Sequence, residues 1–567
     1  MKHRFKFKKL AFAALILVFW LFVLFSVQCL IVPKYQTGIV EGSMIEEYYD
    51  EELDHEVIMV GDCEVYENIS TIELWKEYGI TSYIRGSAQQ LTWHSYYLLE
   101  DTLRYETPKV VVFNVLALKY NEPQSEAYNR MTLDGMRWSS SKVNAIKASM
   151  IKDSVDKETG KVKEGENFID YVFPMFRYHS RWSELSADDF KHIYTKNKVT
   201  HNGYYMRVDS KAQEDFPPPE LLYDYKFGDN AMKYLQMMTD LCKEKGIELV
   251  LIKAPTEEPY WYDQWDSQMV KFAEENELSY INFIPLQDEI GLDMSVDTYD
   301  KGLHLNLSGA EKFADYFGKW LVENHDLTDY RENPEYSEVW QEKVEDYEKA
   351  KEAQFKEIAE YGKIVSLGPI ETKENSIVKN LIVLAVLAAL CLTLVACNTS
   401  STTEESVNST SSEAAQTSET VSKNEPAGTP VAKNNGYVMA VNGVNVSIDA
   451  PMASLLEGLG EPTKYYESES CAFQGLDKVY TYGSVIIRTY PIDGVDYVLN
   501  IELKDDTVTT VEGLAIGDAK SKVTSLYGEP TDSNDSAVRY VKNGSVLTVF
   551  LTDGVVSAIS YSSEDSI

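Results

Sequence analysis

Two short segments, far apart in the chain, hold the side chains best suited to nucleophilic chemistry. The first is an apolar run over residues 57–60 that ends in the triplet Gly61-Asp62-Cys63. Such a run predicts a buried strand that brings a small nucleophilic side chain to the carboxyl edge of a sheet. A thiol at the end of a strand can be activated by a nearby imidazole, so Cys63 is the predicted nucleophile.

The second segment can supply that imidazole. Asp300 precedes His304 by four residues, and a loop and a capped helix follow. A histidine takes the proton of the nucleophile, and a carboxylate holds the histidine in place. We therefore expect His304 to be the base and Asp300 the orienting carboxylate, with Asp297 as a further candidate for the second role. The other histidines lack such a context and are expected to be structural or surface residues.

Hydrophobic periodicity predicts strands and helices that alternate around both segments. Strands are expected over residues 55–60, 81–84, 109–116, 247–252 and 279–283, and helices over 72–78, 93–105, 231–245, 268–276 and 310–324. This alternation predicts a parallel sheet that is covered by helices on both faces. In such sheets the ligand site lies beyond the carboxyl ends of the strands, where both segments fall.

The two segments together resemble the SGNH (GDSL-type) hydrolase superfamily, with Cys63 at the position of the family's serine. The resemblance covers roughly residues 55–120 and 228–325. It implies a three-layer α/β/α, flavodoxin-like SGNH domain built on a parallel sheet. The spacing of Asp300 and His304 departs from the family, in which the Asp is usually one position closer to the His.

The resemblance also implies an oxyanion hole made by a glycine and an asparagine at the ends of neighbouring strands. Gly86 matches the glycine and Asn114 matches the asparagine. The family's usual Gly-x-Asn-Asp motif is absent, so Asn121 is an alternative to Asn114. Such donors matter because stabilisation of the tetrahedral oxyanion is usually the largest catalytic contribution.

The subtype that the chain resembles most consists of membrane-anchored SGNH proteins that move acyl groups on cell-envelope polymers. Examples are the lipoteichoic-acid D-alanylation protein and alginate acetyltransferases. The implied function is an extracytoplasmic acyl esterase or O-acyltransferase that acts on a cell-envelope polysaccharide or acylated polymer, with a membrane acyl-donor protein as a partner and no cofactor. The alternative is a catalytically inactive SGNH-like scaffold that binds glycan, which the Cys-for-Ser exchange and the altered Asp–His spacing favour.

Composition limits the other classes of function. The 567 residues are too many for one core, so two folded domains with connectors are expected. The formal net charge of -37 argues against binding nucleic acid, which needs clustered Lys and Arg. No group of His and Cys has the spacing of a zinc site, so no metal is expected.

The N-terminus carries a membrane signal. The apolar stretch over residues 10–32 follows a basic segment and exceeds the roughly 20 residues that span a bilayer. The basic flank should stay in the cytoplasm, which places the bulk of the chain on the extracytoplasmic side of the cell membrane. A cleaved signal peptide is the rival interpretation. The long apolar core and the lack of a prompt small-x-small site favour an uncleaved anchor.

A second apolar run, residues 381–396, ends in Leu-Val-Ala-Cys at Cys397 and resembles a bacterial lipobox. Cys397 would then be the lipid-modified first residue of a lipoprotein. Because such a signal belongs at the start of a chain, Val378 could mark an alternative start, with two adjacent genes read as one chain. A second transmembrane helix is the other interpretation, but the run is short and Lys373 and Lys379 flank it on the external side.

The last part of the chain contains an internal repeat, in which residues 455–463 match residues 523–531. Each copy predicts a short helix that ends at Gly-x-Pro. Asp-Gly pairs at 493–494 and 553–554 predict strand hairpins after the helices. Two tandem helix–hairpin repeats, each of αβββ type, are expected to make a C-terminal α+β domain, which resembles small lipoprotein modules of the outer-membrane-assembly and β-lactamase-inhibitor-like kind that act by binding.

The predicted organisation therefore has six parts. They are a transmembrane anchor (1–33), an SGNH-like domain (34–330) with an aromatic-rich insertion (118–227), a charged helical connector (331–377), a lipoprotein-type signal or second apolar segment (378–397), a Ser/Thr-rich linker (398–435) and the repeat domain (436–567). The aromatic side chains of the insertion either form a lid that stacks on sugar rings or make a small core of their own. The connector is expected to be an exposed stalk or a packing arm.

Overall fold

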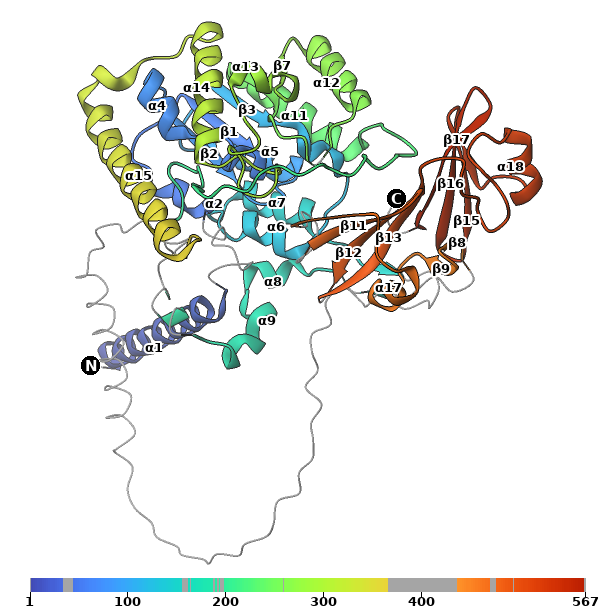
Figure 1. Cartoon of the computed structure of the whole chain (residues 1–567). Helices are drawn as coiled ribbons and strands as arrows, with labels where there is room; N and C mark the ends of the chain where they lie inside the picture. The colour runs from blue at the N-terminus through green and yellow to red at the C-terminus, as the bar shows by residue number, and fades with distance from the viewer. Residues whose placement is uncertain are drawn as a thin grey trace, which may run out of the picture. The chain divides into compact units, whose positions relative to one another are not determined.

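The computed structural model describes residues 2–33, 44–155, 162–163, 165–186, 189–190, 193, 198–258, 260–365, 436–469, 476–492 and 494–564. These residues form an α/β domain with a parallel sheet and a separate domain with an antiparallel sheet (Figure 1). Cys397, the rest of the 378–397 segment and the 398–435 linker lie outside the described residues.

The α/β domain is built on a five-stranded sheet in which every neighbouring pair is parallel. Its strands are β1 (Val57–Gly61), β2 (Ser82–Gly86), β3 (Val110–Asn114), β6 (Glu248–Lys253) and β7 (Ser279–Asn282), in the order β2-β1-β3-β6-β7. All residues of β1, β2 and β3 are buried, and β1 and β3 accordingly read as almost continuous apolar runs, whereas β2 also buries Ser82 and Arg85. The strand expected over residues 109–116 ends at Asn114, because a 3-10 helix over Val115–Lys119 follows it.

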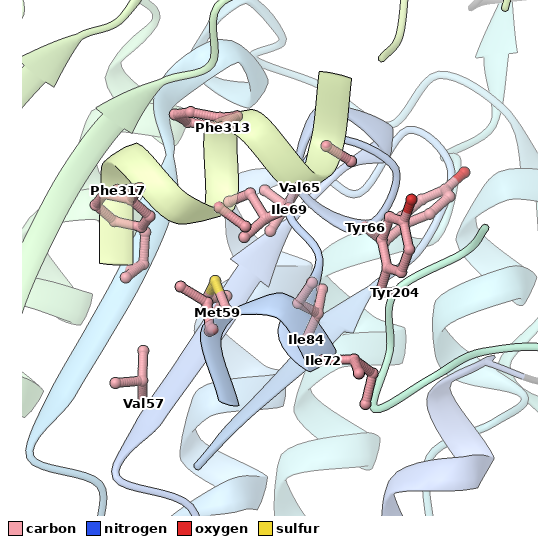
Figure 2. Packing of buried hydrophobic residues seen from close by; sticks show 14 of the residues in the cluster. Val57, Met59, Val65, Tyr66, Ile69, Ile72, Ile84, Tyr204, Phe313 and Phe317 are labelled. Atoms are coloured by element: carbon pink, nitrogen blue, oxygen red, sulfur yellow. The ribbon is translucent and has the colours of Figure 1, made fainter. Parts of the chain in front are cut away.

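One face of the sheet is covered by three helices. They are α4 (Thr71–Tyr78), α14 (Leu307–Asn324) and α15 (Pro334–Tyr361). Figure 2 shows Phe313 and Phe317 of α14 near Met59 of β1. The charged helix α15 buries Trp340, which stacks on Trp75 of α4 with ring centroids 4.8 Å apart. The connector is therefore a packing arm over this part of its length.

The opposite face, which carries Ile58 and Val60 of β1, contacts another set of helices. They are α5 (Thr92–Thr102), α11 (Asp229–Lys245) and α12 (Asp263–Asn276). The start of α11 is fixed by Asn121, whose Oδ1 accepts the backbone N–H of Asn230 at 2.9 Å. Asn121, the alternative oxyanion donor, thus has a capping role in this structure.

Four α-helices with complete bounds lie in the described part of the insertion. These are α6 (Glu126–Leu133), α7 (Ser140–Ser149), α8 (Phe168–Val172) and α9 (Met175–Tyr178). Their small core is mostly aliphatic and includes Leu133, Ile146 and one of the predicted aromatic residues, Tyr171. Tyr204 and Tyr205 instead belong to the main core of the domain. The aromatic side chains are therefore divided between two cores and the surface, and do not make one core of their own.

The described residues of the antiparallel domain form one large sheet, a separate strand pair and two short helices. The helices are α17 (Ala453–Leu459) and α18 (Lys520–Tyr527), and the sheet joins β10 (Lys464–Glu469), β11 (Leu476–Tyr482), β12 (Val485–Ile492), β13 (Val495–Leu503), β17 (Val555–Ser563), β16 (Ser545–Thr552), β15 (Ala537–Lys542) and β14 (Asp532–Ser533) in that order. Strands β8 (Val438–Val441) and β9 (Val444–Ser447) pair separately. Asp553 and Gly554 connect β16 and β17 with φ of 51° and 77°, as a type I′ hairpin turn requires.

The N-terminal helix α1 spans Lys2–Ile31. Its segment Ala14–Ile31 has a mean hydropathy of 2.7, and 6% of that segment is buried. Within the described part of the chain it is the one helix long and apolar enough to cross a membrane, a test that a signal sequence near the N-terminus also passes.

Candidate active site

Cys63 lies at a sharp turn where β1 passes into a four-residue helix, α3 (Cys63–Tyr66). Asp62 caps this helix, because its carboxylate accepts the backbone N–H of Glu64 at 3.2 Å. The turn needs glycine at position 61, since a Cβ there would lie 2.5 Å from Cγ2 of Val65. The strand order of the sheet reverses at β1, so Cys63 stands at the place where open α/β sheets bind their ligands.

The loop before α14 brings Asp300 and His304 together despite their four-residue spacing. One oxygen of Asp300 accepts the backbone N–H of His304 at 2.8 Å, and the other lies 2.6 Å from His304 Nδ1. Lys301 and Gly302 between them have φ of 73° and 108°, and this left-handed backbone turns the chain tightly enough to close the contact. The spacing therefore leaves the expected carboxylate–imidazole pair intact.

Asp297, the further candidate for this role, has other partners. Its Oδ2 accepts from Lys312 Nζ at 2.6 Å and from the backbone N–H of Asp293 at 2.8 Å. Asp297 thus holds the loop to α14, and Asp300 is the carboxylate next to His304.

The charges around His304 favour its protonated form. Burial alone would lower the pKa of His304, but the negative charges of Glu67, Cys63 and Asp300 raise that pKa well above its usual value. Because Nδ1 faces Asp300, Nε2 is the ring nitrogen suited to exchange a proton with the thiol. The arrangement favours an imidazolium at His304, a charge that would stabilise a thiolate at Cys63.

At two other histidines no carboxylate offsets the effect of burial, and the net pKa shift is downward. Burial lowers the pKa of both His94 and His201 to about 3, so each stays neutral inside the fold. His94 accepts the backbone N–H of Leu91 at 3.1 Å and thereby caps α5. These positions agree with the expected structural role.

Glu67 is a site residue that the sequence analysis missed. Its carboxylate is buried, lies 3.9 Å from His304 Nδ1 and accepts a hydrogen bond from the Tyr299 hydroxyl. Burial raises the pKa of Glu67 more than the charge of His304 lowers it. The Tyr299 ring also stacks on His304, with centroids 6.0 Å apart. The imidazole thus has a second carboxyl group close to the one that orients it.

A fully buried polar network packs against the turn and contacts it through Asp62 and Glu64. Lys253, the last residue of β6, donates to both carboxylate oxygens of Glu64 at 2.8 and 2.9 Å. Thr256 donates to Glu64 at 2.9 Å as well. Burial and the charge of Glu64 raise the pKa of Asp62 to about 6. A lysine at the end of an otherwise apolar strand is the sequence signal that could have indicated this ion pair.

Asn114 belongs to the same network. Its amide donates to Asp62 at 3.1 Å and to Glu64 at 2.9 Å, and its oxygen accepts the backbone N–H of Ala254 at 3.2 Å. Both amide hydrogens therefore point at carboxylates. A role for Asn114 as an oxyanion donor stays a prediction, and it would require the amide to leave one of these partners.

Gly86 lies next to the turn, because it pairs in register with Gly61 of β1. A Cβ at position 86 would lie 3.0 Å from the Tyr66 ring and 3.2 Å from the carbonyl oxygen of Gly61. This close packing requires glycine whether or not the residue also contacts an oxyanion.

The structure thus gathers Cys63, His304 and Asp300 at one edge of the sheet, with Glu67 beside them. Among the described residues no group of three or more His, Cys, Asp or Glu side chains could hold a metal ion. No protein-family model and no curated protein matches the chain.

Proposed function

We propose that the chain is a membrane-anchored, extracytoplasmic SGNH-like enzyme that hydrolyses or transfers acyl esters of a cell-envelope glycan or polymer. Cys63 is the nucleophile, His304 the proton carrier and Asp300 the residue that orients it. The observation that carries this proposal is the 2.6 Å contact of Asp300 with His304, whose raised pKa includes the charge of Cys63 among its causes.

The first half of the reaction forms a thioester. The Cys63 thiolate attacks the ester carbonyl, and the carbonyl electron pair moves to the oxygen of a tetrahedral intermediate. That intermediate collapses as protonated His304 gives its proton to the leaving alcohol. Acyl-Cys63 remains, with a neutral imidazole held by Asp300.

The second half returns the site to its starting state. Neutral His304 removes a proton from water or from an acceptor hydroxyl, which attacks the thioester carbonyl. Collapse of the second intermediate expels the Cys63 thiolate and leaves the imidazolium. Water gives a free acid, whereas a polymer hydroxyl gives a transferred acyl group.

Three further features support the assignment. Counting only the strands of the parallel sheet, the order is 2-1-3-4-5, which is the order of flavodoxin-like doubly wound sheets. The apolar helix α1 suits a membrane anchor. In the C-terminal domain, a short helix precedes four strands twice over, in keeping with tandem helix–hairpin repeats that serve as a binding module.

The test uses the full chain in detergent, exposed to p-nitrophenyl acetate and digested for peptide mass analysis. We expect an acetyl group on the Cys63 peptide that hydroxylamine removes and that Cys63→Ala abolishes. His304→Ala should slow both formation and turnover of the adduct. The matched control is Cys242→Ala, because burial raises the pKa of Cys242 to about 12 and this thiol should stay unreactive.

A catalytically inactive glycan-binding scaffold is the second candidate, and one observation favours it. The amide of Asn114 and the backbone N–H of Glu64 both donate to carboxylates in the structure, so neither faces a substrate oxygen. The scaffold function requires no adduct on Cys63 and an alkylation rate that falls as the pH drops below about 8.5, as it does for an ordinary thiol. An acetyl-thioester would exclude it.

A further inference from the structure

A short stretch of the insertion exposes an unusual number of large apolar side chains. We call Ile169, Phe173, Phe176 and Trp182 the aromatic patch; their side chains are between 41% and 71% exposed. The rings of Phe173 and Phe176 touch edge to face, with centroids 5.9 Å apart. Exposed apolar residues that gather in one place mark an interaction surface, whereas singly scattered ones need no explanation.

The structure fixes these side chains on the outside. Tyr171 of the same stretch is buried in the small core, and its hydroxyl donates to Glu166 at 2.6 Å. Arg177 holds the following turn through Glu126, at 2.9 Å. With the inward side of the stretch occupied, Phe173 cannot turn inward without breaking these contacts.

The patch lies near the point where the chain enters the domain from its anchor. Ile45 of helix α2 (Met44–Glu47) is 1% exposed and belongs to the same small core as Tyr171. Only thirteen residue steps separate Ile31, the end of α1, from Met44. At most roughly 3.5 Å per step, the entry point lies within about 45 Å of the end of the apolar helix.

We propose that the aromatic patch is a membrane-contact surface that inserts into the headgroup region of the bilayer in which α1 is anchored. Aromatic side chains favour this boundary, because they combine a large apolar surface with tolerance of a partly polar setting. Arg177 is paired with Glu126 and Arg181 with Asp189, so the proposed contact rests on the apolar side chains, and Arg181 also donates to the carbonyl oxygen of Ile31 at the end of α1. A single helix only tethers the domain, whereas this second contact fixes which side of the domain faces the membrane.

The test places a polarity-sensitive fluorescent amino acid at position 182 of the full chain, reconstituted in phosphatidylcholine–phosphatidylglycerol vesicles. The same label at Leu21, near the middle of α1, reports insertion of the anchor when it is read with lipids brominated near the ends of their acyl chains, and at Val270 of α12, which is 43% exposed, it serves as a matched control. We expect a blue-shifted emission at 182 and quenching of at least about half by lipids brominated near the headgroup. The label at Val270 should stay water-like and unquenched.

Each other outcome overturns the proposal. An unquenched, water-like label at 182 beside a quenched label at Leu21 means that the patch stays in solvent. A blue shift at 182 without quenching by brominated lipid means that protein covers the patch. An unquenched label at Leu21 means that α1 is outside the bilayer and gives the patch no membrane to contact.

Discussion

Replacing Lys253 with Met tests how much the network below Cys63 contributes to the fold. Met retains the length and apolar stem of lysine but removes an ammonium group that is completely buried and donates to Glu64 at 2.8 and 2.9 Å. The carboxylate of Glu64 is then left in the interior without its cation. Removing one partner of such a pair costs about 3–5 kcal/mol, since the remaining charge has neither water nor a counter-ion. In a domain of this size that loss lowers the unfolding midpoint by roughly 6–10 °C.

The fluorescence of tryptophan isolates the relevant transition, because all nine tryptophans lie before residue 341 and none lies in the antiparallel domain. Trp20 lies in α1 and the other eight lie in the α/β domain, so denaturant unfolding of the full chain, followed by tryptophan fluorescence, reports mainly that domain. The double variant Lys253→Met/Glu64→Gln removes both charges and should recover more than half of the lost stability. Lys76→Met is the matched control, because Lys76 is 30% exposed and its pairing with Glu73 contributes at most about 1 kcal/mol.

A loss below about 1 kcal/mol in Lys253→Met would show that Glu64 does not need its cation. A double variant as unstable as the single one would also refute the reasoning, because the cost would then come from packing and not from an unpaired charge. The same proteins carry a functional readout. Since Asn114 joins Glu64 to Asp62, alkylation of Cys63 should slow in the single variant and recover in the double one.

Three more changes are informative. Glu67→Gln removes a negative charge 3.9 Å from His304, so the imidazole pKa measured by NMR should fall. Protonated His304 stabilises the fold, and this contribution is fully present below about pH 6.5. In the variant it should be lost at a lower pH than in wild type. Gly86→Ala forces a Cβ to 3.0 Å from the Tyr66 ring and should cost about 1–3 kcal/mol by denaturant unfolding, and a neutral result would mean that α3 can shift. Trp340→Ala removes a buried side chain of α15 and should lower the free energy of unfolding by about 3–5 kcal/mol. If α15 were an exposed stalk, the same change would cost almost nothing.

The parallel sheet could be predicted from the sequence because it is buried on both faces. Because β1 and β3 are buried along their whole length, nearly every residue in them is apolar, and such runs predict strands without any other information. The ends of the strands were harder to predict. After β3 a 3-10 helix continues the apolar run to Leu118, and its sequence resembles that of the strand. Local chain geometry also hid the choice between Asp297 and Asp300, which depends on the left-handed turn at Gly302.

The remaining site residues depend on contacts between distant parts of the chain. Glu64 and Lys253 are 189 residues apart; the lysine at the end of β6 indicates a buried cation, but nothing local shows that Glu64 is its partner. Glu67 follows Cys63 by one helical turn, but its role appears only when the loop with Tyr299 folds over it. Asn114 was correctly predicted to lie at the end of a strand. The carboxylates of Asp62 and Glu64 that accept from its amide could not be predicted from the sequence. Sequence patterns report burial well and report polar partners across the fold poorly.

The charge balance of the site offers a physical reason for cysteine at position 63. A serine nucleophile needs a neutral imidazole to remove its proton, but Glu67 and Asp300 raise the pKa of His304 independently of the charge of Cys63, which is the contribution that serine removes. A thiol does not need that step, because the thiolate and the imidazolium stabilise each other. Cys63→Ser should therefore be nearly inactive at pH 7 and gain activity as the pH rises through the pKa of His304. A serine variant that matches wild type in p-nitrophenyl acetate hydrolysis at pH 7 would mean that His304 is neutral there.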